Sequence, residues 1–381
     1  MQRENPLLIL LKKEIKKLLK KGVLQGVFPS AAAGVIYGSG KGKEEVIVHY
    51  GHATLYPEKR KILKNNYFDL ASLTKPLATT LAVLCLIKEK KIDIDEKLSS
   101  LVEKKIKGEK SKITTRDLLS HSSGFPAHRE YFTILKDIPA KEKKEFVENI
   151  ILQEKLEYKA GTMSVYSDLG FILLGRIIEK KTGCSLSHYV EEKVLRPFKL
   201  EKKIFYMPMG DGGKNLKKTD FVATENCPWR KKILCGEVHD DNCYTMDGVA
   251  GHSGLFGNIA GVTALAGLLL DIWKGKAVHP NMNKEDLQVF LARQKHIPGS
   301  SWALGFDTPA KKASSSGIHF SRESVGHLGF TGTSFWIDPE KEVVIVLLSN
   351  RVHPSRENVQ IKKFRPDFHD SVMEKLFPES K

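Results

Sequence analysis

The sequence has few cysteines and none in a C-x-x-C pair. The five are Cys85, Cys184, Cys227, Cys235 and Cys243. An odd number without paired spacing argues against a disulfide framework and against a cysteine-based zinc site. Reduced thiols, together with the absence of an export signal pattern in the first residues, favour a cytoplasmic location.

Long apolar runs are also missing. No run approaches the roughly 18 apolar residues that a membrane-spanning helix needs, so we expect no transmembrane segment. Residues 7–19 alternate leucine and isoleucine with lysine, which predicts an amphipathic helix rather than a signal peptide. We expect this helix to pack against the body of the protein, and contact with a membrane surface is the alternative.

Acidic residues are too few to balance the basic ones. The chain has 61 Lys+Arg against 45 Asp+Glu, a formal charge of +16, which can indicate a nucleic-acid or anionic-surface partner. The lysines are, however, spread from end to end and mixed with glutamates, as in residues 141–145. Because no basic stripe alternates with aromatic residues, we predict a solvated lysine-rich surface and no nucleic-acid partner.

What the chain does have is an apolar helix with one lysine near its start. Leucines and an isoleucine recur at spacings of three and four between residues 73 and 87, which predicts a helix. Its other positions are mostly apolar too, so we expect it to be buried on most sides. Lys75 is its only charge before Lys88, and a lysine is rarely buried without a partner. Ser72 precedes Lys75 by three residues and so shares its helix face.

The Ser72 and Lys75 pair has a chemical use. A serine hydroxyl is a weak nucleophile until a base takes its proton, and burial lowers the pKa of an ammonium group. Ser72 also lies at the predicted helix N-terminus, where free N–H groups favour negative charge. The alternative is structural: Ser72 caps a core helix, and Lys75 extends its amine to solvent.

Each end of the chain predicts a β-hairpin. Residues 31–37 and 45–50 flank a glycine-rich turn, and residues 332–337 and 343–348 flank a turn at 338–341. Neither hairpin can be stable alone, so we expect both to join one antiparallel sheet.

The middle of the chain is mainly helical in pattern. Helices are predicted over 142–156, 169–181 and 260–273, whereas 207–247 reads as a long excursion or lid and 309–325 as a flexible, exposed loop. The predicted fold is therefore α+β, an antiparallel sheet from both chain ends flanked by helices. We predict a sheet domain of residues 1–110 and 255–381 and a mostly helical inserted domain of 111–254.

Two further segments carry candidate site residues. Tyr166 and Asp168 lie just before an apolar helix, which Asp168 can cap. If Tyr166 lies near Lys75, its phenol can relay a proton; otherwise it only packs. In residues 325–333, three glycines permit close approach of a ligand, and an edge strand there could offer a backbone N–H to an oxyanion. A bulged edge strand without function is the alternative.

The three motifs S-x-x-K, Y-S-D and H-L-G, in this order, resemble those of the serine β-lactamase and penicillin-binding-protein superfamily. The branch most similar contains class C β-lactamases, D-aminopeptidases and D-Ala-D-Ala carboxypeptidases. The resemblance runs from about residue 25 to residue 355. Residues 68–76 match the pattern F-x-x-A-S-x-T-K, and 118–126 are similar to L-L-x-H-x-S-G-x-P. This resemblance implies a β-lactamase/transpeptidase-like fold and no cofactor.

The resemblance also implies roles for the first two motifs. Ser72 corresponds to the acylated nucleophile, Lys75 to its general-base partner and Tyr166 to the tyrosine of Y-x-N. Asp168 stands where the family usually has asparagine, so it adds a negative charge that raises the pKa of Lys75. This departure argues against efficient β-lactam recognition.

The third motif is an H-x-G form of the family's K-T-G. His327 and Gly329 belong to it, and the backbone N–H of Phe330 then corresponds to the second oxyanion donor, beside that of Ser72.

Residues 236–242 and 248–257 look like a subgroup that includes muropeptide amidases, which separate N-acetylmuramic acid from L-alanine. We expect His239, Asp240 and His252 of these segments to line the pocket or support a lid. A metal set is the alternative, although ligands at regular spacing are lacking.

The function expected is that of a serine hydrolase that forms an acyl-enzyme with an amide or ester, on a small peptidoglycan-derived substrate such as a muropeptide. One alternative is a β-lactamase or D,D-peptidase, with a β-lactam or peptide as ligand. Another is a non-catalytic muropeptide-binding protein, which the intact Ser72, Lys75 and Tyr166 argue against. The oligomeric state is left open.

Overall fold

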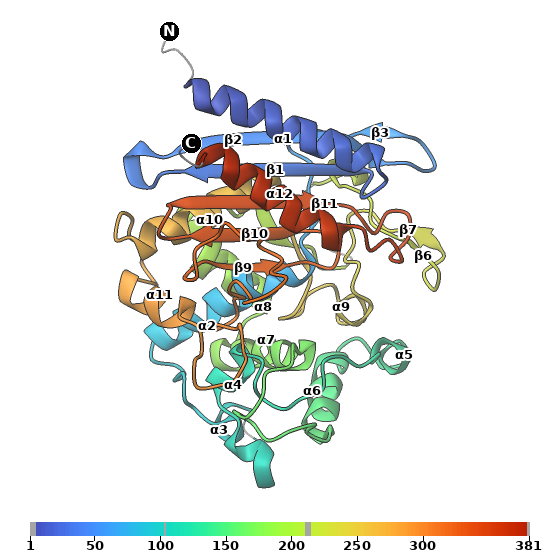
Figure 1. Cartoon of the computed structure of the whole chain (residues 1–381). Coiled ribbons are helices and arrows are strands. Elements are labelled where there is room, and N and C mark those ends of the chain that lie inside the picture. The colour runs from blue at the N-terminus through green and yellow to red at the C-terminus, as the bar shows by residue number, and fades with distance from the viewer. Residues whose placement is uncertain (1–4, 103, 210–214, 379–381) are drawn as a thin grey trace.

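A six-stranded antiparallel sheet occupies the upper half of the molecule in Figure 1. The computed structural model describes residues 5–102, 104–209 and 215–378. The strand order is β3-β2-β1-β11-β10-β9. The strands are β1 Ser30–Tyr37, β2 Glu44–Thr54, β3 Arg60–Lys61, β9 Val325–Leu328, β10 Ser334–Asp338 and β11 Val343–Ser349. Since β1 pairs with β11, the two terminal hairpins form one sheet, as predicted.

Both faces of this sheet are apolar, because consecutive residues of its central strands are apolar and their side chains point to opposite faces. On β1, Ala31, Ala33 and Val35 join a core with α1 (Pro6–Leu24) and α12 (Ile361–Leu376). Ala32 and Ile36 point the other way, into the core that contains α10 (Ile259–Trp273). The sheet therefore lies between a two-helix outer layer and an inner layer that begins with α10 (Figure 1).

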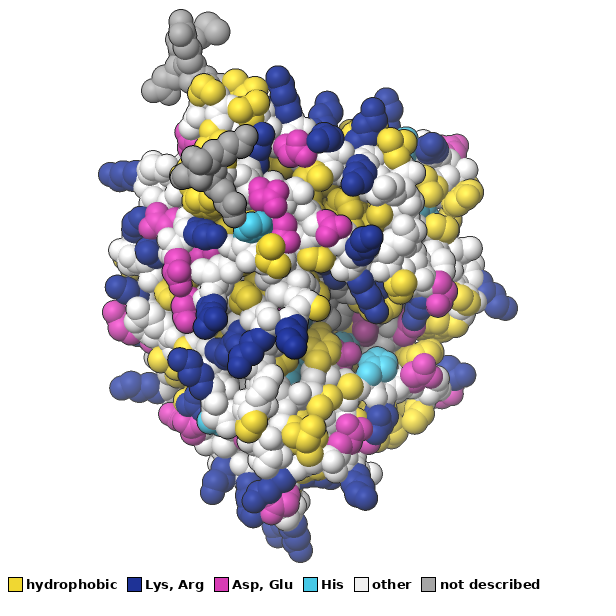
Figure 2. Space-filling model, viewed as in Figure 1, with side chains coloured by type: hydrophobic (Ala, Val, Ile, Leu, Met, Phe, Trp, Pro, Cys, Tyr) yellow, Lys and Arg dark blue, Asp and Glu magenta, His cyan; other side chains and the backbone are white. Residues whose placement is uncertain are grey.

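Helix α1 packs along β2 and against α12. Leu11, Ile15 and Leu19 on one stripe are fully buried, and the lysines between them are exposed. The amphipathic segment thus lies on the body of the protein, as predicted. Lys and Arg side chains are scattered among acidic ones over the face shown in Figure 2.

Residues 98–291 carry most of the remaining helices, and several of these helices lie in the lower part of Figure 1. They are α3 Leu98–Leu101, α4 Thr115–Leu119, α5 Phe132–Leu135, α6 Lys143–Gln153, α7 Asp168–Thr182, α8 Leu186–Val190, α9 Asp241–Thr245 and α11 Lys284–Leu291. Two small sheets add β4 Phe68–Asp69, β5 Ile204–Tyr206 and β8 Leu255–Gly257, and β6 Asn226–Cys227 with β7 Lys232–Ile233. Three predicted helices are confirmed as α6, α7 and α10, and the domain division stays a prediction.

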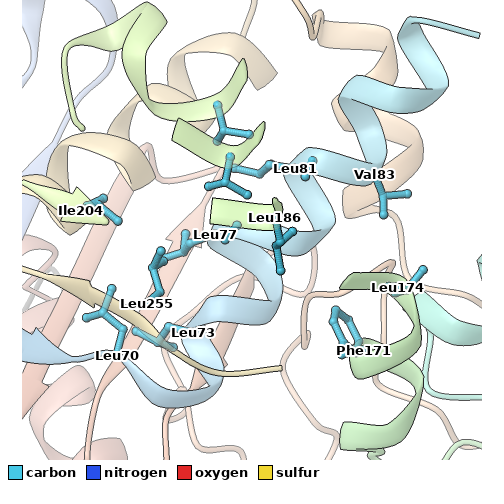
Figure 3. Close-up of a cluster of buried hydrophobic side chains, with 14 of the residues drawn as sticks. Leu70, Leu73, Leu77, Leu81, Val83, Phe171, Leu174, Leu186, Ile204 and Leu255 are labelled. Carbon is cyan, nitrogen blue, oxygen red and sulfur yellow. The ribbon is translucent and has the colours of Figure 1, made fainter. Parts of the chain in front are cut away.

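The predicted central helix is one helical run with three geometries. A 3₁₀ turn at Ala71–Leu73 leads into a π-helix at Lys75–Thr80 and then into α2 at Leu81–Lys88. Apolar side chains from other segments, including Phe171 and Leu255, surround it (Figure 3). By length and composition Ala71–Lys88 could cross a membrane, but 83% of it is buried inside the protein. We therefore assign it to the core.

One of the two long loops predicted from the sequence, 207–247, has the expected irregular structure, and the other, 309–325, is less exposed than expected. Residues 207–247 are irregular, as predicted, with the β6–β7 hairpin and α9 inside them, while 210–214 lie outside the described residues. The 309–325 loop is not simply exposed, because Ser316 and Phe320 are buried. Helix α12 holds it through Asp370, whose carboxylate accepts the Ile318 N–H at 2.7 Å.

Candidate active site

The site begins at a tight turn between β4 and the central helix. The carboxylate of Asp69 accepts the N–H of Ala71 at 2.8 Å, and Ala71 has a φ of 48°. A non-glycine residue in this left-handed region is strained and persists only where its surroundings fix it. Here the strained residue directly precedes Ser72, which lines an open cavity.

The side chain of Lys75 is completely buried beneath Ser72. Its Nζ lies 3.1 Å from Ser72 Oγ, 2.7 Å from Asp168 Oδ1 and 3.1 Å from the His252 carbonyl oxygen. The centroid of the Tyr166 ring is 4.8 Å away. The structure therefore brings together the four residues that the first two motifs suggested.

The protonation of Lys75 differs from what burial alone suggests. Burial would lower its pKa, but Asp168 and Tyr166 raise the pKa above the ordinary value. Burial would raise the pKa of Asp168, yet Lys75 and His128 hold it well below its usual range. Near neutral pH the pair is therefore ammonium and carboxylate. The expectation of a lowered lysine pKa is wrong, and the expected raising effect of Asp168 is confirmed.

Tyr166 is placed to exchange protons while staying a neutral phenol. Burial raises its pKa more than the neighbouring Lys75 and Ser72 side chains lower it. Its ring packs against His121 at 4.7 Å and Trp302 at 5.6 Å between centroids. This packing fixes the phenol above the Ser72 and Lys75 pair.

The H-L-G motif lies on the sheet edge beside the nucleophile turn. Strand β9 is the last strand of the six-stranded sheet, so the edge strand is confirmed, although Asp307 pairs with Gly326 on its outer side. The Thr333 hydroxyl donates to the Leu70 carbonyl at 3.1 Å. A Cβ on Gly329 would clash with Thr333 Oγ1 and lie 2.8 Å from the Leu70 carbonyl oxygen, so this approach requires glycine.

Phe330 follows Gly329, and its ring is held from two sides. His239 stacks on it at 5.5 Å between centroids, and the Arg351 guanidinium lies 4.3 Å from its centroid. The Thr331 hydroxyl donates to the Asp69 carbonyl at 2.8 Å. The Phe330 backbone is thereby anchored to the turn that carries Ser72.

His327 is buried and neutral. Burial and then Lys75 lower its pKa to about 3. With its Nδ1 protonated, it donates to the Leu328 carbonyl at 2.8 Å. The ring lies 5.9 Å from that of Tyr166, so His327 borders the site without adding a charge to it.

His239 and Asp240 line the larger cavity, as predicted, whereas His252 is buried behind Asp240 and lines neither cavity. The three side chains do not converge on one point. His252 Nε2 is 2.9 Å from Asp240, whereas His239 Nε2 is 3.1 Å from Glu225. Burial would raise the pKa of Asp240, and His252 lowers it to about 2. Within the described ranges, no group of three or more His, Cys, Asp and Glu side chains is placed to hold a metal ion. All five cysteines are free.

Several residues of the site were missed by the sequence reasoning. They are His128, whose Nδ1 lies 3.1 Å from Asp168, and the cavity residues Trp229, Glu225, Trp302 and Arg356. They come from irregular segments, where neither periodicity nor a motif distinguishes a site residue from a loop residue. Only the tertiary fold brings them to Ser72.

Two cavities meet at Ser72. One has a volume of about 910 Å³ and the other about 480 Å³. Ser72, Tyr166, Phe330 and Arg356 line both, so the serine lies at their junction. A substrate can therefore extend to either side of a bond attacked by Ser72.

Comparisons with known proteins agree with this geometry. The model of the β-lactamase family matches residues 15–366. The sequence is 32% identical to an N-acetylmuramyl-L-alanine amidase of Bacillus subtilis (strain 168), over 90% of this chain and 81% of that protein. It is also 32% identical to a putative D-alanyl-D-alanine carboxypeptidase of Escherichia coli (strain K12), over 80% of this chain and 73% of that protein.

Solved structures give the same fold. An octameric penicillin-binding protein homologue from Pyrococcus abyssi has a TM-score of 0.70 at 17% identity, covering 96% of this chain and 76% of that chain. The predicted resemblance and the predicted α+β fold are both confirmed.

Proposed function

This chain belongs to the β-lactamase family of serine hydrolases, and we propose that it cleaves the amide between N-acetylmuramic acid and L-alanine in peptidoglycan fragments. The observation that carries the chemistry is the contact of the buried Lys75 with Ser72 at 3.1 Å and Asp168 at 2.7 Å. The substrate is suggested by the amidase relative and by the sequence of residues 236–257.

In the proposed acylation, Ser72 Oγ attacks the carbonyl carbon of the amide. Because Lys75 is an ammonium, it donates to Oγ and stabilises the charge that develops there, rather than removing the proton. Tyr166 accepts the proton of Ser72 and passes its own phenolic proton to the leaving nitrogen. The C–N bond breaks, and an ester to Ser72 and a free amine result.

Deacylation follows the same path in reverse. A water molecule attacks the ester carbonyl, gives a proton to Tyr166, and Tyr166 returns one to Ser72 Oγ. In both steps the backbone N–H groups of Ser72 and Phe330 stabilise the oxyanion, a kind of contribution worth about 3 kcal/mol per donor. Asp168 holds Lys75 charged and in position.

A second candidate is a D,D-carboxypeptidase, because a relative at 32% identity carries that name. One experiment separates the two. The purified protein is incubated with a muropeptide mixture, and the products are identified by mass spectrometry, with Ser72→Ala as the control.

Release of the intact peptide beginning with L-alanine supports the amidase. Loss of one C-terminal alanine supports the carboxypeptidase instead. Unchanged muropeptides, or equal conversion by the Ser72→Ala variant, contradict both.

A further inference from the structure

The two cavities at Ser72 differ in the groups that line them. In the larger one, Trp229 and Phe132 form an aromatic wall, with ring centroids 5.3 Å apart at an interplanar angle of 32°. Trp229 is 37% exposed, although Phe132 and the Arg230 guanidinium pack against its ring, so part of the indole remains accessible to a ligand. Its Nε1 donates to Asp241 at 2.8 Å, and Arg230 in turn donates to Asp241 at 2.7 Å. The wall is therefore fixed before any ligand binds.

The charged groups of the larger cavity are mostly acidic. They are Glu130, Asp168, Glu225, Asp240, Asp241 and Glu357. Arg356 also lines it, but this guanidinium is bound to Glu225. Asp168, Asp240 and Asp241 likewise contact Lys75, His252 and Arg230, so Glu130 and Glu357 are the lining carboxylates that form no ion pair within the described residues. Such a cavity disfavours an anion, whereas its carboxylates can accept hydrogen bonds from hydroxyl groups.

The smaller cavity has the opposite character. Its cations are Arg351, Lys362 and Arg365, besides Arg356, which is bound to Glu225. Asp307 is its single carboxylate, and burial raises the pKa of Asp307 to about 6. Lys362 is exposed and forms no ion pair within the described part of the chain. A cationic cavity with a free ammonium is suited to a ligand carboxylate.

We propose that this difference fixes the orientation of the substrate, an inference that rests on the proposed function. The muramyl half carries no charge once its carboxyl group is in the amide, and its pyranose ring packs on the wall of Trp229 and Phe132. Its hydroxyls donate to the carboxylates around it. The peptide half bears free carboxylates and occupies the smaller cavity, where Lys362 pairs with one of them.

The test measures binding to the Ser72→Ala protein by calorimetry, so that turnover does not interfere. Three probes are used: N-acetylmuramyl-L-alanyl-D-glutamate, the same compound with a lactyl group in place of the sugar, and the sugar compound with its carboxylates amidated. Adding Trp229→Ala should lower the affinity for the sugar compound about fivefold and leave the affinity for the lactyl compound unchanged. Trp229→Phe, which keeps an aromatic face, should retain most of the affinity.

Adding Lys362→Ala should lower the affinity for both acidic probes about tenfold and leave the affinity for the amidated probe unchanged. Lys363→Ala, at the neighbouring exposed position outside the cavity lining, is the matched control and should have no effect. The proposed orientation is overturned if Trp229→Ala lowers the affinity for the sugar and lactyl probes equally. It is also overturned if Lys362→Ala lowers the affinity for the acidic and amidated probes equally. A lack of binding of the sugar compound overturns it as well.

The proposed function is judged separately, on the protein with Ser72 intact. If that protein binds the sugar compound with the predicted pattern but does not cleave it, the amidase proposal fails and the assigned orientation stands. If it cleaves the compound while the two substitutions act equally on all probes, the orientation fails and the amidase stands.

Discussion

The lysines of helix α1 and Lys75 of the helical run at Ala71–Lys88 lie in opposite environments. The lysines of α1 all lie on its exposed side, and a stripe with Ile15 at its centre is buried. In the central run, Lys75 is buried among apolar side chains, and it survives there because Asp168 pairs with it. In α1 the charged residues keep to the exposed side of an amphipathic helix. In the central run Lys75 is a charged residue at a buried position. A charge that breaks a local pattern points to chemistry.

The largest effect is expected from removing the buried charge. Lys75→Met should lower kcat/KM by at least about 10³-fold, because Ser72 loses its ammonium. The variant should also lose about 3 kcal/mol of unfolding free energy, since Asp168 loses its buried ammonium partner and keeps only the half-exposed His128 beside it. Steady-state kinetics and urea unfolding measure the two effects.

A second substitution tests the cause of that instability. Adding Asp168→Asn to Lys75→Met should restore most of the unfolding free energy but none of the activity. A double variant as unstable as the single one would contradict the pairing argument.

A substitution in the buried stripe of α1 should change the stability of the protein but not its activity. Ile15 is fully buried against the sheet, so Ile15→Ala should cost about 2–5 kcal/mol of unfolding free energy. The kcat of the folded fraction should stay at the wild-type value, because α1 lies on the face of the sheet away from Ser72. A changed kcat at full folding would show that the two regions are coupled.

The Asp168→Asn substitution alone should shift the pH profile. Removing the carboxylate takes away the main influence that raises the pKa of Lys75, so burial lowers that pKa. Because the ammonium form is the active one in our mechanism, the alkaline limb of kcat against pH should move to lower pH. If Lys75 is instead a neutral base, the acidic limb moves to lower pH and activity at acidic pH rises.

The smallest effect is expected at an exposed lysine of α1. Lys16→Ala should change the unfolding free energy by no more than about 0.5 kcal/mol and leave kcat/KM unaltered, since its amine is solvated. A loss comparable to that of Lys75→Met would remove the contrast between the two helices.

Much of the fold followed from local pattern. The hairpins that became β1–β2 and β10–β11 have short, largely apolar runs on both sides of a turn, and α7 and α10 are apolar helical segments, so their elements could be predicted. The π-helical geometry at Lys75–Thr80 could not, because spacings of three and four predict a helix without defining its hydrogen-bond pattern. The burial of Phe320 depends on α12, which lies far along the chain.

The site was predictable only where a motif carries it. Ser72, Lys75, Tyr166 and Asp168 stand in short motifs, and the structure brings them together. The charge state of Lys75 needed the distance to Asp168, because burial and pairing shift its pKa in opposite directions. Trp229 lies in an irregular segment, so no local signal marked it.

The central claim is that Ser72 is acylated during turnover. A fluorophosphonate probe followed by peptide mapping tests it most directly, because such a probe marks an activated serine. We predict an adduct on Ser72 in the wild type and none in the Lys75→Met variant. An adduct confined to another residue, or equal labelling of Ser72 in both proteins, would contradict the account.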